Sequence, residues 1–95
     1  MAEIENCRHS RDELIGKLIE NLTTLRAKAG ITQSELADII GIGRQTMLAI
    51  ESRKGKMRWD TFLALVLFFS KNGETLELMI FLGLHLDLIE DSIKG

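Results

Sequence analysis

Two neighbouring side chains with forked hydrogen-bonding groups, Arg44 and Gln45, stand where a helix is expected to begin. A guanidinium can bind the edge of guanine through two hydrogen bonds, and a primary amide can bind adenine in the same way. A helix N-terminus adds free backbone N–H groups that attract phosphate. The pair therefore points to recognition of a nucleic acid.

Basic charge is concentrated around this pair. Residues 44–58 have a net charge of +4, from Arg44, Arg53, Lys54, Lys56 and Arg58 against Glu51 alone. Residues 73–95 have a net charge of −4, from Glu74, Glu77, Asp87, Glu90 and Asp91 against Lys94. The net charge of −2 for the whole chain hides this asymmetry, which indicates a localised anionic partner. On charge alone, a solvated basic loop is the simpler interpretation.

Residue types suited to catalysis or metal binding do not form a recognisable site. Cys7 and His9 lack the second pair of ligands that a tetrahedral zinc site needs. His85 has no Ser or Cys nucleophile at a suitable spacing. The Gly41-Ile42-Gly43 run lacks the preceding strand and the third glycine of a dinucleotide-binding fingerprint. We therefore expect no enzymatic activity, no metal and no cofactor.

Composition indicates a single folded domain. The chain has 95 residues, of which 45% are hydrophobic, too many for a disordered segment. Its densest apolar run, residues 62–69, is far shorter than the ~20 residues of a membrane span, and residues 1–12 do not resemble a signal peptide. A lone Cys7 fits a reducing compartment, so a cytoplasmic location without membrane association is expected.

The spacing of apolar residues by three and four positions, together with the absence of proline, predicts an all-α fold. Gly30 and Gly41 are expected to end the first two helices, and Thr32 with Glu35 forms a capping box before the second. The fourth helix is apolar almost all round, which predicts a buried hub. The predicted helices span residues 12–29, 33–40, 44–52, 59–71 and 74–82, with a weaker one at 85–93.

Residues 33–52 combine two short helices with a glycine turn between them. Ala37 is small where the two helices must approach, and Gly41 permits a left-handed turn. The apolar underside comes from Ile42, Met47 and Ile50. The outward positions of the second helix are Arg44, Gln45, Leu48 and Ala49, with Thr46 nearer the flank. The alternative is an ordinary helical hairpin within a small bundle.

At these residues the sequence resembles the Cro/repressor-type (XRE) family of helix-turn-helix transcriptional regulators. The resemblance covers about residues 14–71 and is carried by Ile31-Thr32-Gln33-Ser34-Glu35-Leu36-Ala37, Gly41-Ile42-Gly43-Arg44-Gln45-Thr46 and Ile50-Glu51. It implies a compact five-helix lambda-repressor-like DNA-binding domain that places helix 44–52 in the major groove of a palindromic operator. The chain then divides into an N-terminal arm (1–11), the DNA-binding domain (12–73) and a short C-terminal helical extension (74–95).

The same resemblance implies roles for individual residues. Arg26 and Glu51 are expected to form a partly buried structural ion pair. Gln33 is expected to contact phosphate and to brace the recognition side chains. The residues expected to face bases are Arg44, Gln45 and Ala49. The other residues of the expected DNA-binding set are Thr32, Gly43, Thr46, Arg53, Lys54 and Lys56, with Arg58 as a further candidate for the DNA backbone.

Two positions depart from the family pattern. Gly43 occupies a helix cap where the family often has Ser or Thr, so a phosphate-contacting hydroxyl is missing. Leu48 is apolar at a position that usually faces solvent. Three interpretations of Leu48 stay open: contact with a thymine methyl, packing on the basic loop, or a protein interface.

The C-terminal extension is unusually rich in apolar residues: Leu76, Met79, Ile80, Leu84, Leu86, Leu88 and Ile89. They either cap the core around Phe62, Phe68 and Phe69 or form a homodimer interface within residues 76–93, and both can hold.

These patterns favour a dimeric, sequence-specific DNA-binding transcriptional regulator that acts as a repressor. Two alternatives stay open. One is the antitoxin of a toxin–antitoxin pair, which binds a toxin and represses its own operon. The other is a protein-interaction adaptor that does not bind DNA.

Overall fold

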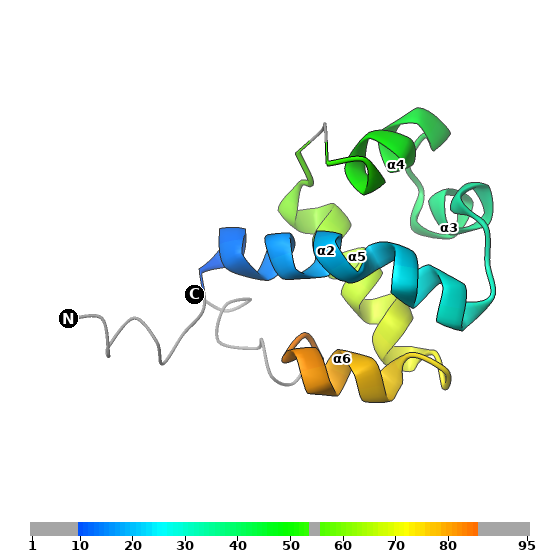
Figure 1. Ribbon diagram of the computed structural model, residues 1–95. Helices are drawn as coiled ribbons and strands as arrows, with labels where there is room; N and C mark the ends of the chain where they lie inside the picture. The colour runs from blue at the N-terminus through cyan, green and yellow to red at the C-terminus, as the bar shows by residue number, and fades with distance from the viewer. Residues whose placement is uncertain (1–9, 54–55, 86–95) are drawn as a thin grey trace.

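A computed structural model of the chain describes residues 10–53 and 56–85, which form five α-helices and no strand (Figure 1). The all-α prediction is therefore confirmed over these residues. The helices are α2 (Arg11–Ala29), α3 (Gln33–Ile40), α4 (Arg44–Glu51), α5 (Trp59–Lys71) and α6 (Leu76–Leu82). None of the five is both long and apolar enough to cross a bilayer. Several predictions lie outside the described residues: those for Cys7, His9 and Lys54, and all of the helix expected at 85–93 except His85.

Local caps set the ends of the first two helices. The backbone N–H of Glu35 donates to Thr32 Oγ1 at 3.0 Å, and that of Thr32 donates to Glu35 Oε1 at 2.8 Å, which confirms the predicted capping box. Ser10 and Glu13 form a second capping box, so α2 begins at Arg11, inside the predicted arm. Gly30 and Gly41 follow the two helices with φ of 73° and 79°, a conformation that favours glycine.

Two helix boundaries differ from the prediction, the end of α4 and the start of α6, because a turn replaces helix at each. The prediction extended the helix of α4 to Ser52, but Glu51 is its last residue and Ser52 is the C-cap. The last helix begins at Leu76 rather than at Glu74. The reason is a turn around Asn72, whose side-chain oxygen accepts from the Glu74 N–H at 2.9 Å and whose carbonyl accepts from the Thr75 N–H at 3.2 Å.

The helices pack around a shared core, with α2 and α5 crossing at the centre, α3 and α4 on one side and α6 on the other (Figure 1). The central helix α5 contributes four fully buried residues: Phe62, Leu65, Val66 and Phe69. It is not buried all round, because Leu67 is 45% exposed. The hub prediction is thus correct for the four buried residues of α5 and wrong for Leu67.

The start of α5 is fixed by aromatic contacts. Trp59 stacks on Phe62 with ring centroids 4.7 Å apart, and the guanidinium of Arg11 lies 4.6 Å from the centroid of the Trp59 ring. A cation above an aromatic face is held by the ring quadrupole. This contact joins the first turn of α2 to the residue that follows the basic loop.

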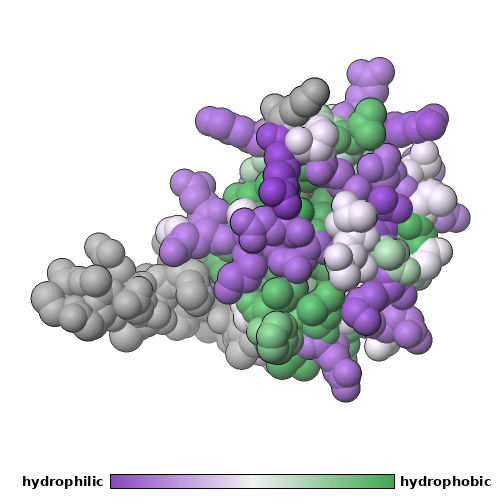
Figure 2. All heavy atoms as spheres, viewed as in Figure 1, coloured by the Kyte–Doolittle hydropathy of each residue, from purple (hydrophilic) through white to green (hydrophobic). Residues whose placement is uncertain are grey.

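The C-terminal segment covers the core and also leaves apolar surface exposed. Met79 and Leu84 are fully buried, so the core-capping interpretation holds for them. Lys17 of α2 donates from Nζ to the carbonyl of Leu82 at 3.0 Å and ties down the end of α6. By contrast, Ile80 and Phe81 are 49% and 84% exposed. Apolar surface gathers in Figure 2 in the region that α6 occupies in Figure 1.

Candidate nucleic-acid interface

The N-terminal turn of α4 presents polar groups that have no partner of their own. Arg44 and Gln45 are exposed, and no hydrogen bond or ion pair engages their side chains within residues 10–53 and 56–85. Gly43 caps the helix without a side-chain hydrogen bond, so its first N–H groups are open to a ligand. These donors face outward together on the helix that the sequence singled out.

An ion pair holds the other end of α4 from behind. Arg26 Nε lies 2.7 Å from Glu51 Oε2, and Arg26 Nη2 lies 3.3 Å from Glu51 Oε1. The two side chains are only 20% and 6% exposed. Arg26 Nη1 also donates to the carbonyl of Ile31 at 3.1 Å, so one guanidinium joins α2, the loop before α3, and α4.

Glu51 accepts two further hydrogen bonds. Gln33 donates from Nε2 to Glu51 Oε1 at 3.1 Å, and Thr23 donates from Oγ1 to the same oxygen at 3.2 Å. Burial opposes ionisation of Glu51, but the hydrogen bonds from Arg26, Gln33 and Thr23 and the charge of Arg26 outweigh it. The pKa of the carboxyl group is therefore lowered. Glu51 thus stays a carboxylate that fixes α2, α3 and α4 to one another.

Gln33 and Thr32 already have intramolecular roles. The amide nitrogen of Gln33 braces α4 by donating one N–H to Glu51, which leaves its second N–H and its oxygen without a partner among the described residues. The hydroxyl oxygen of Thr32 accepts from Glu35 in the capping box, and the residue is exposed. Both residues lie at the start of α3, the helix that packs against α4.

The basic residues that follow α4 differ in how available they are. Arg53 and Lys56 are exposed, and no partner engages their side chains within the described part of the chain. Arg58 instead pairs with Asp60, with Nε 3.2 Å from Oδ1. The hydrogen bond from Arg58 lowers the pKa of the Asp60 carboxyl group. The carboxylate in turn neutralises part of the positive charge of Arg58. Polar side chains project over α4 in Figure 2.

The remaining predicted residues occupy different depths on α4. Thr46 is exposed, whereas Ala49 is half-buried and its carbonyl accepts from the Ser52 hydroxyl at 3.1 Å. Met47 and Ile50 are buried, which confirms the predicted underside. Leu48 is 55% exposed. The structure therefore brings Arg44, Gln45, Thr46 and Leu48 to the accessible side of the helix.

Sequence reasoning missed two features of this region. Thr23 was not linked to Glu51, although it lies three residues before Arg26 and so on the same side of α2. Arg53, which belongs to the expected DNA-binding set, has a φ of 64°, in the left-handed region that β-carbon-bearing residues avoid. The residue types around Arg53 do not predict this backbone conformation.

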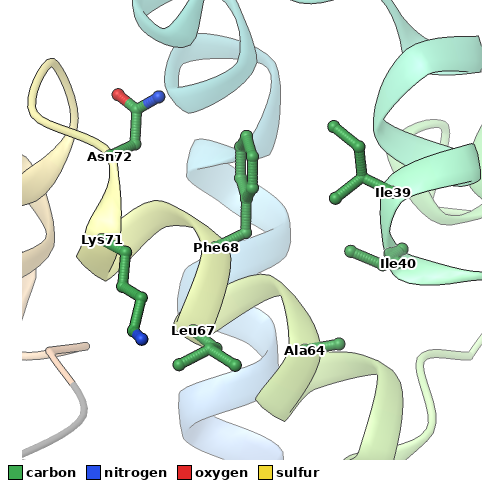
Figure 3. A pocket seen from close by; sticks show the side chains of 7 residues that line it. All are labelled: Ile39, Ile40, Ala64, Leu67, Phe68, Lys71 and Asn72. Carbon is green, nitrogen blue, oxygen red and sulfur yellow. The ribbon is translucent and has the colours of Figure 1, made fainter.

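A separate apolar groove lies away from these polar groups, between α3 and α5 (Figure 3). It has a volume of about 460 Å³ and is open to solvent. Its lining consists of Ile39, Ile40, Ala64, Leu67, Phe68, Lys71 and Asn72. Lys71 and Asn72 are its only polar side chains, so the groove offers apolar contact rather than catalytic chemistry.

No protein-family model, no curated protein and no solved structure matches this chain. The interpretation of the site therefore depends on its own geometry and chemistry.

Proposed function

We propose that this chain is a sequence-specific DNA-binding transcriptional repressor of the lambda-repressor-like helix-turn-helix class. In this proposal α3 and α4 are the motif, and α4 enters the major groove. The observation that carries it is the exposed pair Arg44 and Gln45, which has no partner among residues 10–53 and 56–85, on a helix fixed from behind by Glu51. Because α4 is held in place before binding, its backbone does not have to be ordered when these side chains meet a base edge.

The contacts divide by chemistry. Arg44 and Gln45 read base edges with bidentate hydrogen bonds, and Ala49 makes an apolar contact with a base. Arg53 and Lys56 neutralise phosphates, together with Lys54, which lies outside the described residues. The remaining contacts to the DNA backbone are assigned to the N-terminal ends of α3 and α4, at Thr32, the second amide N–H of Gln33, the backbone N–H beside Gly43, and Thr46.

The proposal includes a homodimer on a palindromic operator, formed through the part of residues 76–93 that α6 contributes. Ile80 and Phe81 are exposed on α6, and α6 and α4 lie on opposite sides of the crossed helices α2 and α5 (Figure 1). A two-fold contact through α6 therefore leaves both copies of α4 free for two half-sites.

Selection of bound duplexes from a random pool, followed by titration of the recovered duplex, tests the DNA-binding proposal. Arg44→Ala and Gln45→Ala each remove a bidentate contact and should weaken binding about tenfold or more. Lys71→Ala is the matched control, because it removes one exposed positive charge at the far end of α5. Recovery of no preferred sequence, or equal binding by all four proteins, would contradict the proposal and favour the adaptor alternative.

Phe81→Glu tests the dimer. A charge in place of an 84% exposed ring leaves the core intact and should convert a dimer into a monomer in sedimentation measurements. Leu67→Glu on the groove side of α5 is the control and should leave the dimer unchanged. Met79 cannot serve here, because it is fully buried and a charge there would unfold the domain.

A further inference from the structure

Leu48 is a large apolar side chain on a surface that is otherwise polar and basic. It is 55% exposed, whereas its neighbour Met47 and the nearby Ile50 are buried in the core. Single exposed leucines are common on proteins, so exposure alone says little. The position of Leu48 on α4, beside Arg44 and Gln45, is what indicates a role in binding.

Leu48 shares a helix face with the two base-reading side chains. It follows Gln45 by three residues and Arg44 by four, the two spacings that place side chains beside each other on a helix. The rise along the axis from Arg44 to Leu48 is ~6 Å, at about 1.5 Å for each residue. Base pairs are stacked about 3.4 Å apart, so this rise corresponds to one or two base-pair steps.

The setting of Leu48 argues against a protein interface. The other exposed large apolar residues of the described chain lie elsewhere: Ile39 and Leu67 line the groove, and Ile80 and Phe81 are on α6. On α4 its exposed neighbours are Arg44 and Gln45 instead. A protein partner that buried Leu48 would also have to desolvate Arg44, which has no acidic partner in the described part of the chain.

The side chain of Leu48 has no donor or acceptor, so it cannot bind phosphate or a polar base edge. The one apolar group that B-DNA presents in the major groove is the C5-methyl group of thymine. We infer that Leu48 contacts a thymine methyl and selects a T·A pair one or two steps from the base pair that Arg44 reads. This inference rests on the proposed function, and it predicts one base of each half-site.

Replacement of thymine by deoxyuridine tests this contact, because deoxyuridine lacks only the methyl group. The duplex recovered from the random pool is resynthesised with one thymine at a time replaced in both half-sites. Wild-type protein should bind about threefold to tenfold more weakly when the contacted thymine is replaced. Leu48→Ala should bind the thymine and deoxyuridine duplexes equally, and its binding to the thymine duplex should be weakened by a similar factor.

A matched control is available in Ile39→Ala. Ile39 has the same 55% exposure but lies on the groove of α3 and α5, so this variant should keep the wild-type response to deoxyuridine. The base pair at which Arg44→Ala loses specificity gives an independent check. The sensitive thymine should lie one or two base-pair steps from it.

The outcomes separate the inference from the function beneath it. If a specific duplex is recovered and Leu48→Ala keeps the full response to deoxyuridine, or no thymine matters, the role of Leu48 is overturned while DNA binding stands. If no duplex is preferred, both are overturned. Loss of the response in Leu48→Ala alone supports the methyl contact.

Discussion

Arg26 and Glu51 stand 25 residues apart in the chain and meet in a two-point ion pair, with Nε 2.7 Å from Oε2 and Nη2 3.3 Å from Oε1. The pair joins the last turn of α2 to the last residue of α4. It therefore fixes the direction in which the N-terminal turn of α4, with Arg44 and Gln45, points out of the domain.

Removal of one partner of this ion pair should destabilise the fold. Arg26→Ala leaves Glu51 mostly buried without its main counter-charge, and we expect the free energy of unfolding to fall by roughly 2–4 kcal/mol. Urea denaturation followed by circular dichroism measures it. Lys71→Ala removes an exposed charge and should change the value by less than about 0.5 kcal/mol. Similar small effects for both variants would contradict the structural role of the pair.

Stability should depend on the ionisation of Glu51. Its folded pKa is lowered from the ordinary value of 4.5, so the unfolded chain binds more protons at this site than the folded chain. The stability it contributes is complete above about pH 4.5 and is lost as the pH falls through the folded pKa. Between pH 6 and pH 3 the urea midpoint of the wild type should therefore fall more than that of Glu51→Gln. Asp60→Asn, in an exposed pair, should retain the wild-type profile.

The same substitution at two glycines should have opposite effects. Gly43 has a φ of −70°, and a β-carbon there would stand 3.7 Å from Thr46 Oγ1, an ordinary contact. Gly43→Ser adds a capping hydroxyl to α4 and restricts the unfolded chain, which should stabilise the fold by about 0.5–1 kcal/mol. Gly41→Ser forces a side chain into a φ of 79° and should destabilise it by about 1 kcal/mol. Thermal unfolding of the two variants measures both signs, and an equal effect would refute the backbone argument.

Arg53 should trade stability for DNA affinity. Its φ of 64° is unfavourable for a side chain with a β-carbon, and an exposed Arg53 gains nothing from the described residues that offsets this strain. Arg53→Gly should raise the free energy of unfolding by about 0.5 kcal/mol, because relief of strain exceeds the added entropy of the unfolded chain. The same variant should weaken DNA binding and reduce the slope of log affinity against log salt by about one.

Arg53→Lys provides the control for that prediction. It keeps both the charge and the strained backbone, so its stability and its salt dependence should stay close to wild type. If Arg53→Gly binds DNA as tightly as the wild type, Arg53 has no role in binding and its conformation is only a consequence of how α4 ends.

The helix ends were predictable wherever a short-range hydrogen bond sets them. Thr32 and Glu35 cap α3 through contacts between residues three apart, so their spacing alone identified the box. The Ser10 and Glu13 box has the same spacing and starts α2 at Arg11, one residue before the predicted start. Helix α6 begins two residues later than predicted, because the backbone N–H groups of Glu74 and Thr75 bond to Asn72 in a turn instead of starting the helix.

The position of Arg44 and Gln45 at the start of a helix was predictable, but the hydrogen-bond partners of the residues around them were not. Arg44 and Gln45 follow a glycine turn, so their place at a helix start was clear from the sequence. That Gln33 uses its amide nitrogen on Glu51 depends on the distance between α3 and α4, which no sequence spacing specifies. The proposed base contacts of Arg44 and Gln45 are predictions that the duplex titrations described above will test.

By itself, the sequence determined the all-α fold of the described residues, the capping of α3 and the buried underside of α4, because helix periodicity and caps act over three or four residues. Only the tertiary structure decided which of several chemically similar residues on one helix are buried and which are exposed. Phe69 is buried and Leu67 exposed on one apolar helix, and Met79 is buried beside an exposed Ile80. The physical reason is that a helix which is apolar on every side has no preferred inner face until the other helices pack against it.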